Sequence, residues 1–480
     1  MSEHGGEGAL RTKIVATIGP ASGTQDMIRA LAEVGVDVVR INMAHGTHES
    51  HAQVIGWVRH TAEGLGKPMA ILTDLAGPKI RIGELAQPIQ LREDAELVLA
   101  PEGEEQGAEI PQAYAGLARD VVAGNRILLD DGAMELRVVA TDGDRVRARV
   151  VRGGLLKEHK GMNLPGIKVS VPALTEKDIA DLAFAVEHGV DYVGLSFVQH
   201  ASDIEDLRRR IPPGTLIVAK IEKDTALEEL EQILAATDAV MVARGDLGVE
   251  LPFEQVPLAQ KRIIQHANLY GRPVITATQM LESMIENSRP TRAEVSDVAN
   301  ALLDGTDAVM LSGETAAGKY PLLAVDAMVR IAGEIERSAA FENGPKYDLP
   351  ILDHLRQGAT PTEHAVAAAS VEAASLLGAP ALVTFTRTGL TARLVSSYRP
   401  PVPIVAVSDQ ERTYRQMALV WGVKPVRFTG SVITYEDMLS CAREFLLQQG
   451  LARPGQRVVI TAGVPFHVPG STNMMRVEVV

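Results

Sequence analysis

The chain has 480 residues, an apolar share of 46%, few aromatic residues and a formal net charge of −14. This length exceeds what one hydrophobic core supports and indicates about three domains, while the acidic balance argues against non-specific binding to nucleic acid or an anionic membrane. The single cysteine, Cys441, excludes an intrachain disulfide. Because we find neither a signal-peptide core nor an apolar run of membrane-spanning length, we expect a cytoplasmic protein.

Residues 1–10 are rich in Gly and Glu and are expected to be disordered. A repeating unit follows, in which a short apolar strand precedes an amphipathic helical pattern. The strands are expected at 13–19, 36–42, 70–74, 192–197, 216–222, 239–246, 274–279 and 308–313. Eight strands, seven of them followed directly by helical patterns, predict an α/β fold with a parallel (β/α)8 barrel over 11–77 and 172–345.

More than a hundred residues separate the third and fourth predicted strands, too many for a loop. Short alternating runs with DDG and TDGD turns inside this gap are typical of antiparallel strands. We therefore predict an inserted small antiparallel β-barrel domain at 78–171 that acts as a lid over the barrel mouth. It ends at a Pro- and Gly-containing hinge, after which Thr175 and Asp178 form a capping-box-like helix start.

The residues near 340–362 are interpreted as a connector to a C-terminal domain at 346–480. An Ala-rich helical stretch there is followed by the strand-like runs ALVTFT, PIVAVS, KPVRF, RVVITAG and RVEVV. This alternation predicts a doubly wound α/β sheet with the last strand at an edge. Because no cluster of acids and bases marks these strand ends, we expect a regulatory or assembly role.

Charged residues end two neighbouring barrel strands. One apolar run leads to Lys220 and Glu222, and the next leads to Arg244, Gly245 and Asp246. A strand covered on both faces favours continuous apolar residues, so these charges must face something else. The simplest account is a divalent metal held by Glu222 and Asp246, with Lys220 beside it and the Gly245 and Asp246 amides opening a short helix that can receive an anion. The alternative is a structural ion pair between Lys220 and one acid.

The other strand ends add cations, carboxylates and hydroxyls to the same rim. The full set is Arg40, Asn42, Asp74, Ser196, Lys220, Glu222, 244–246, 276–279 and 312–314. Phosphoryl transfer requires a metal, neutralising cations and accurate positioning, with little covalent chemistry by the protein. The rim therefore predicts a metal-dependent enzyme that acts on a small phosphate.

Longer strings carry a family resemblance across almost the whole chain. They are TKIVATIGPAS (12–22), RINMAHGTHESH (40–51), GPKIRIG (77–83), KGMNLPG (160–166), AKIE (219–222), ARGDLGVE (243–250), TATQMLESM (276–284), PTRAEVSDVANA (290–301) and MLSGETAAGKYP (310–321). Together they resemble the pyruvate kinase family. The resemblance implies phosphoryl transfer from phosphoenolpyruvate to ADP, protonation of the enolate to pyruvate, a Mg²⁺ or Mn²⁺ cofactor and a homotetramer.

The resemblance also implies roles for individual residues. Glu222 and Asp246 would hold the divalent ion, and Lys220 would stabilise the transferring phosphoryl group. The Gly245 and Asp246 amides and the Thr278 hydroxyl would hold the substrate carboxylate, with Thr278 near the face where the enolate is protonated.

Further positions complete the implied site. Arg40 would grip the phosphoryl oxygens, and Ser196 joins the substrate-binding set. The residues implied to contact the nucleotide are Arg81, His45, Lys160 and Asn42. Because Lys160 comes from the predicted lid, closure would complete the site and exclude water.

One departure from the family pattern concerns the K⁺ ion that many members hold beside the phosphoryl group. Asn42 and Asp74 match its ligands, but Ala44 and Leu75 replace the usual Ser and Thr. Lys79 stands where Glu is common, and its ammonium could supply the missing positive charge. We predict that K⁺ is not required; the alternative is that Lys79 is merely solvated on the lid hinge.

In the C-terminal domain, a loop after a predicted strand resembles the sugar-phosphate effector loop of regulated members. Its candidate residues are Thr386, Arg387, Thr388, Gly389 and Thr391. Their amides and hydroxyls could form a phosphate nest for a sugar phosphate or AMP. The alternative is an ordinary helix start.

Two other functions remain open at this point. A barrel lyase or aldolase acting on phosphoenolpyruvate or pyruvate would share the metal acids and need no ADP. A metabolite sensor would keep the fold without turnover.

Overall fold

The computed structural model describes residues 10–342, 361–430, 434–465 and 472–480. The predicted disordered segment, apart from Leu10, and most of the predicted connector lie outside these ranges. Within them, no helix is long and apolar enough to cross a membrane.

Eight parallel strands form a closed barrel in the order β1-β16-β15-β14-β13-β12-β3-β2. They are β1 (Lys13–Ile18), β2 (Val38–Asn42), β3 (Ala70–Asp74), β12 (Tyr192–Leu195), β13 (Leu216–Ile221), β14 (Ala239–Ala243), β15 (Val274–Ala277) and β16 (Ala308–Leu311). Nearly all of their side chains are buried, as strands covered on both faces require. The predicted barrel is confirmed, although β1, β12, β13, β14, β15 and β16 end earlier than expected. The last polar residues expected in β14 and β15 belong to the following helix and to a turn.

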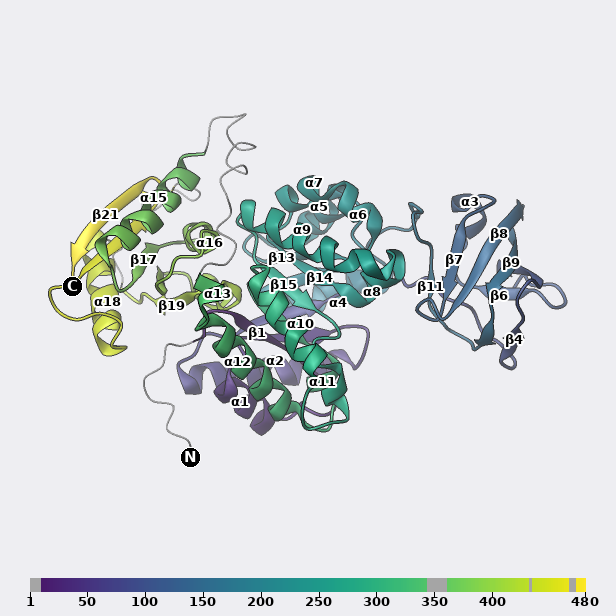
Figure 1. The fold of residues 1–480 in the computed structure, drawn as a ribbon, viewed down its shortest axis with the longest axis horizontal. Helices are drawn as coiled ribbons and strands as arrows, with labels where there is room; N and C mark the ends of the chain where they lie inside the picture. Colours follow the sequence, from purple (N-terminus) through teal and green to yellow (C-terminus); the bar gives the residue numbers. More distant parts are fainter. Residues whose placement is uncertain (1–9, 343–360, 431–433, 466–471) are drawn as a thin grey trace.

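Helices surround this barrel (Figure 1). They are α1 (Gln25–Val34), α2 (His48–Leu65), α4 (Glu176–Glu187), α5 (Ala201–Arg210), α6 (Asp224–Glu228), α7 (Leu230–Ala236), α8 (Arg244–Glu250), α9 (Val256–Leu269), α10 (Arg292–Leu303), α11 (Gly313–Ala316), α12 (Pro321–Glu336) and α13 (Ala339–Glu342), with the short 3-10 turns η1 (Phe253–Gln255) and η2 (Glu282–Ile285). The predicted capping box at α4 is present: Thr175 Oγ1 accepts from the Asp178 amide, and the Asp178 carboxylate accepts from the Thr175 amide.

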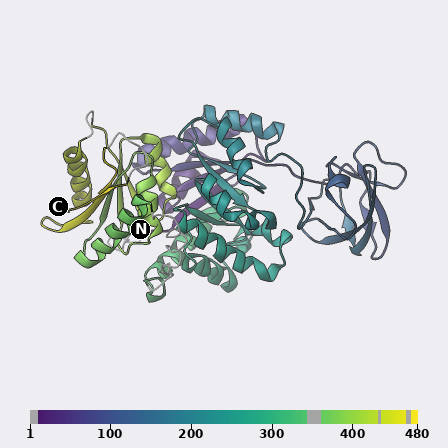
Figure 2. The same cartoon turned by 90° about the horizontal axis from the view of Figure 1, so that it is seen from above.

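Between β3 and α4 the chain builds a separate β domain with its own apolar core. It contains β4 (Ile89–Leu91), β5 (Glu96–Pro101), β6 (Ile110–Gln112), α3 (Leu117–Asp120), β7 (Arg126–Leu129), β8 (Met134–Asp142), β9 (Arg145–Arg152), β10 (Gly154–Leu156) and β11 (Met162–Asn163). A six-stranded sheet, β11-β7-β8-β9-β5-β6, accompanies the pair β10-β4. The pairing is antiparallel as predicted except between β5 and β6, which run parallel. Figures 1 and 2 show this inserted domain standing away from the barrel on two connecting segments.

The C-terminal part forms a five-stranded sheet in the order β19-β18-β17-β20-β21. Its elements are α15 (Thr362–Leu377), β17 (Leu382–Phe385), α16 (Leu390–Ser397), β18 (Ile404–Ser408), α17 (Glu411–Gln416), η3 (Met417–Leu419), β19 (Val423–Arg427), α18 (Tyr435–Gln448), β20 (Arg457–Ala462) and β21 (Met474–Val479). The reversal of strand order at β17 is the doubly wound pattern that we predicted. The last strand, β21, lies at the edge and is antiparallel to β20. The exact domain limits stay a prediction.

The C-terminal domain closes the end of the barrel where the strands begin. Ala418 and Leu419 of η3 belong to the same buried cluster as the barrel's inward-facing side chains. Tyr192, the first residue of β12, donates its hydroxyl to the Gln416 carbonyl at 2.7 Å. The opposite end, where the strands finish, is left for the site.

Candidate active site

Arg40 and Asp74 form the first pair on this rim. They lie on the neighbouring strands β2 and β3, and Arg40 Nε donates to Asp74 Oδ2 at 2.8 Å. Arg40 Nη1 also donates to Thr17 Oγ1 at 3.1 Å on β1. These bonds fix the guanidinium across three strands at the mouth of the barrel.

Lys220 lies at the centre of the rim. Its Nζ is 2.7 Å from Ser196 Oγ, 2.8 Å from Glu222 Oε1 and 3.4 Å from Asp74 Oδ2. Burial alone would lower the pKa of Lys220, but attraction to Asp74 and Glu222 outweighs it and the pKa is raised. The side chain is therefore a fixed ammonium, and it bridges two acids rather than forming a simple pair with one.

Glu222 and Asp246 are the two acids predicted to hold a metal. Burial raises the pKa of Glu222 to about 7, with Lys220 opposing this shift and the Asp246 charge adding to it. Burial likewise raises the pKa of Asp246, with Lys220 opposing and Asp131 of the inserted domain adding. Two desolvated carboxylates that destabilise each other's charge are suited to a divalent cation.

The number of acids also fits such an ion. In the part of the chain that the structure describes, no group of three or more His, Cys, Asp or Glu side chains is arranged as a metal site. Mg²⁺ is commonly held by one or two carboxylates, with substrate oxygens and water completing its shell. The pair of Glu222 and Asp246 matches that pattern.

Thr278 lies in an unusual turn directly after β15. It has φ of 66° and Gln279 has φ of 53°, so two consecutive residues occupy the left-handed region. This is a strained conformation for a β-branched residue and requires support from its surroundings. Thr278 Oγ1 accepts from the Gly245 amide at 2.7 Å and donates to the Ala277 carbonyl at 2.6 Å. A substrate carboxylate would have to share or replace the Gly245 bond.

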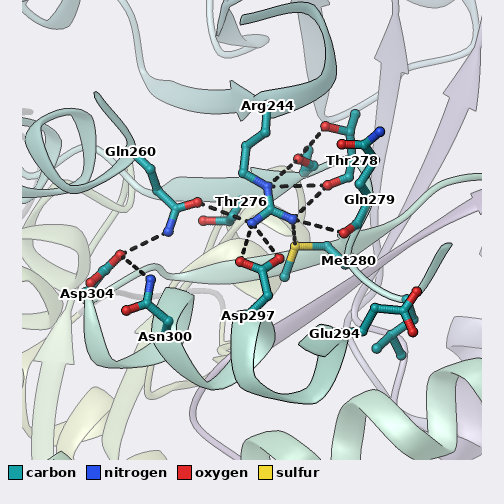
Figure 3. A network of polar contacts seen from close by, with 12 residues as sticks. Arg244, Gln260, Thr276, Thr278, Gln279, Met280, Glu294, Asp297, Asn300 and Asp304 are labelled. Atoms are coloured by element: carbon teal, nitrogen blue, oxygen red, sulfur yellow. Dashed lines mark hydrogen bonds and ion pairs between the residues drawn. The ribbon is translucent and has the colours of Figure 1, made fainter. Parts of the chain in front are cut away.

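Arg244 holds this turn in place, as Figure 3 shows. Its guanidinium donates to the carbonyls of Ala277, Thr278 and Gln279 and forms an ion pair with Asp297 Oδ2 at 2.7 Å. Sequence reasoning placed Arg244 on the rim without a role and did not single out Asp297. The position of Asp297 in the string PTRAEVSDVANA was the available signal.

The last rim segment, 312–314, has a structural role. Glu314 is buried and its carboxylate accepts from the Leu281 and Ser312 amides at 3.0 and 2.7 Å. It therefore connects the loops after β15 and β16.

Lys79 reaches toward the metal acids from the start of the inserted domain. Partial desolvation lowers its pKa, Arg81 and Lys220 add to this, and Asp246 and Glu222 oppose it. The Lys79 side chain is exposed, and its ammonium lies within the electrostatic influence of the two carboxylates.

The residues predicted to contact the nucleotide are less closely gathered. Arg81 forms a β-bridge with Gly161, which brings it beside Lys160. Lys160 Nζ is paired with Asp130 Oδ1 at 2.7 Å, inside the inserted domain. His45 is exposed on the loop after β2, where the Asn42 side chain accepts from the Ala44 amide at 3.1 Å.

The candidate effector residues form one loop between β17 and α16. Gly389 has φ of 81°, and the Thr391 and Thr472 hydroxyls are 2.8 Å apart. The Arg387 carbonyl accepts from Thr413 Oγ1 at 2.8 Å. Several of the loop's polar groups thus hold the fold together, while Thr388 is exposed.

Comparison with known proteins agrees with this architecture. Residues 9–325 match the family model described as pyruvate kinase, barrel domain, and residues 364–478 match pyruvate kinase, alpha/beta domain. The chain is 44% identical over 479 residues to a pyruvate kinase of Geobacillus stearothermophilus, covering 98% of this chain and 80% of that protein. It is 44% identical over 474 residues, 98% of both chains, to one from Mycobacterium tuberculosis (strain ATCC 25618 / H37Rv). The crystal structure of a pyruvate kinase from Cryptosporidium parvum aligns with a TM-score of 0.89 at 35% identity, covering 98% of this chain and 96% of that one.

Proposed function

The chain belongs to the pyruvate kinase family and is a phosphotransferase of this type, and from that premise we propose that Lys220, Glu222 and Asp246 carry its reaction. Its substrates are phosphoenolpyruvate and ADP. The observation that supports the assignment most directly is the Lys220 ammonium, fixed by Ser196, Glu222 and Asp74 beside the desolvated Asp246.

Glu222 and Asp246 would hold Mg²⁺ or Mn²⁺, which would neutralise charge on the substrate's carboxylate and phosphoryl oxygens. Lys220 presents a compact cation to the phosphoryl group as negative charge accumulates on it. Arg40, held by Asp74 and Thr17, orients the phosphoryl oxygens from the neighbouring strand.

Thr278 and the start of α8 would hold the substrate carboxylate. The Gly245 amide already donates to the Thr278 hydroxyl at 2.7 Å, so a bound carboxylate could accept hydrogen bonds from both groups if it replaced that bond. Arg244 keeps the Thr278 turn in position. After phosphoryl transfer, the enolate would be protonated on the face next to Thr278, with water delivering the proton to the enolate carbon.

The inserted domain would act as a lid that brings Lys160 and Arg81 to the nucleotide, with His45 and Asn42 on the barrel side. We also retain the proposals of a cytoplasmic homotetramer and of a sugar-phosphate or AMP effector at 386–391. Titration of the purified enzyme with fructose 1,6-bisphosphate, AMP or a sugar monophosphate tests the effector loop. An unchanged phosphoenolpyruvate saturation curve with all of them would contradict it.

A coupled assay tests the reaction itself. Wild-type protein should form ATP from phosphoenolpyruvate and ADP in the presence of Mg²⁺. Turnover of phosphoenolpyruvate that does not need ADP would favour a lyase, and binding without turnover would favour a sensor.

We further propose that K⁺ is not required, because Lys79 supplies a positive charge near the phosphoryl position. The acids acting most strongly on Lys79 are Asp246 and Glu222. In K⁺-free tetramethylammonium buffer the wild-type enzyme should retain its activity, and Lys79→Glu should become K⁺-dependent. A large activation of the wild-type enzyme by K⁺ would refute the proposal.

A further inference from the structure

The loop that follows β12 contacts two side chains of the site, Lys220 and Glu222. Ser196 Oγ accepts from Lys220 Nζ at 2.7 Å, and the Phe197 amide donates to Glu222 Oε2 at 2.6 Å. Phe197 has φ of 54°, a left-handed conformation that an aromatic residue adopts only when its surroundings impose it. The position of this loop therefore sets the geometry of Lys220 and Glu222.

The same loop contacts the segment that leaves the barrel for the inserted domain. Ser196 Oγ donates to the Leu75 carbonyl at 2.7 Å. A Cβ on Gly77 would lie 2.8 Å from the Phe197 ring and 2.9 Å from Ser196 Cβ, so the outgoing segment packs tightly on this loop. Movement of the outgoing segment would therefore displace Ser196 and Phe197.

Gln199, two residues further on, holds the returning segment. Its Oε1 accepts from the Val169 amide at 3.2 Å, and its Nε2 donates to the Val169 carbonyl at 3.3 Å. The side chain is 7% exposed, and its own amide donates to Asp203 Oδ2 at 2.9 Å, which ties it to the start of α5. A single side chain thus satisfies both main-chain groups of one hinge residue, much as a neighbouring strand would.

Val169 lies at the border between the two domains. The next residue, Ser170, bonds to the inserted domain instead: its amide and hydroxyl donate to the two oxygens of Asp120 at 2.7 and 2.6 Å. The returning segment is therefore held by the barrel at one residue and by the inserted domain at the next.

Building on the proposed function, we propose that Gln199 is a positioning residue that couples the hinge of the inserted domain to the loop carrying Ser196 and Phe197. When the inserted domain moves, Val169 transmits the displacement through Gln199, and Phe197 shifts the carboxylate of Glu222. Metal binding and lid position are thereby made interdependent at a residue that touches neither substrate nor metal.

The test compares Gln199→Met with the wild-type enzyme. Met fills a similar volume but makes neither bond to Val169, so the KM for ADP should rise about tenfold while the KM for phosphoenolpyruvate changes less. Binding of Mn²⁺ in the absence of substrates, followed by electron paramagnetic resonance, should weaken by about tenfold, as when an outer contact of a metal ligand is lost.

Ser170→Ala is the matched control, because it loosens the same segment on the side of the inserted domain only. It should change the KM for ADP and leave Mn²⁺ binding unchanged. Gln199→Glu provides a second variant: it keeps an acceptor for the Val169 amide but repels the carbonyl, and it should give an intermediate loss of Mn²⁺ affinity.

Wild-type Mn²⁺ affinity in folded Gln199→Met and Gln199→Glu would overturn the proposal, as would equal losses of Mn²⁺ affinity in Ser170→Ala. An equal rise in both KM values, with normal Mn²⁺ binding, would also overturn it and indicate a purely structural contact. Failure of the proposed function is distinguishable, since the wild-type protein would then make no ATP from phosphoenolpyruvate and ADP.

Discussion

Asp191 and Glu222 are both buried acids of the barrel, one at each end of its strands, and their surroundings differ. Asp191 shares its carboxylate between Arg59 and Arg415, each at 2.9 Å. Glu222 pairs with Lys220 and one amide, and its pKa is raised to about 7. Asp191, with two guanidinium partners, stabilises the end of the barrel where the strands begin, which we call the closed end. Glu222 has fewer positive partners, so its carboxylate can bind a metal.

The two ends of the barrel also differ in how their residues are held. At the end where the strands finish, Phe197, Thr278 and Gln279 have positive φ. At the end where they begin, Leu419 fills the barrel interior and is fully buried. The residues with positive φ at the site hold its catalytic loops, and packing from another domain stabilises the opposite end.

The largest effect should follow from Lys220→Met at the site end. Removing the ammonium should lower kcat by about a thousandfold, because the transferring phosphoryl group loses a fixed cation. Metal binding should persist, since Glu222 and Asp246 remain. Steady-state assays together with Mn²⁺ titration check both parts; a rate near that of the wild-type enzyme would contradict the role assigned to Lys220.

Lys67→Met is the control from the closed end. Lys67 Nζ donates to the Ala32 and Val36 carbonyls at 3.1 and 2.8 Å and lies 3.6 Å from Asp37. Its loss should lower stability modestly and leave kcat unchanged.

Arg415→Met should have the opposite outcome to Lys220→Met: the free energy of unfolding should fall while kcat changes little. Breaking one partner of a fully buried carboxylate costs about 3 kcal/mol, because the charge of Asp191 is left with less compensation. Urea unfolding followed by fluorescence is suited to this measurement, since Trp421 is buried in the C-terminal domain next to the closed end. If kcat fell as steeply as stability, the two ends would not be separable.

The pH dependence of metal binding offers a third comparison. Folding raises the pKa of Glu222 from 4.5 to about 7, so the folded, metal-free protein holds this proton more tightly than the unfolded chain. The contribution of the protonated Glu222 to folding stability is therefore complete below pH 4.5 and is lost as the pH rises through about 7. A divalent cation competes with the proton, so its affinity should fall about tenfold per pH unit below that pKa.

Melting temperatures with and without Mn²⁺ at pH 6 and pH 8 check this prediction. Mn²⁺ should stabilise the wild-type protein more strongly at pH 8, and Glu222→Gln should reduce this difference, leaving the part that is due to the raised pKa of Asp246. A Mn²⁺ effect that does not depend on pH would contradict the shifted pKa of Glu222.

The sequence predicted the barrel well because doubly covered strands leave continuous apolar runs, and it located Lys220, Glu222 and Asp246 because charges at the ends of such runs are conspicuous. It could not predict the contact of Gln199 with Val169 or of Arg415 with Asp191. These bonds join residues far apart in the chain, and a polar side chain does not reveal its partner. The parallel pairing of β5 with β6 was missed for a different reason, because strands joined by so short a connection are normally antiparallel.

The smallest effect is expected for Arg126→Ala in the inserted domain. Arg126 Nε is 2.9 Å from Glu135 Oε1, the same length as the contact between Arg415 and Asp191, but Arg126 is exposed and Glu135 also lies near Arg137 and Arg152. Solvent screening and the remaining arginines should limit the loss to about 0.5 kcal/mol or less. Equilibrium unfolding and kcat should both match the wild-type enzyme. Because the two ion pairs have the same length, a loss of stability as large as that of Arg415→Met would mean that burial does not determine how much an ion pair contributes here.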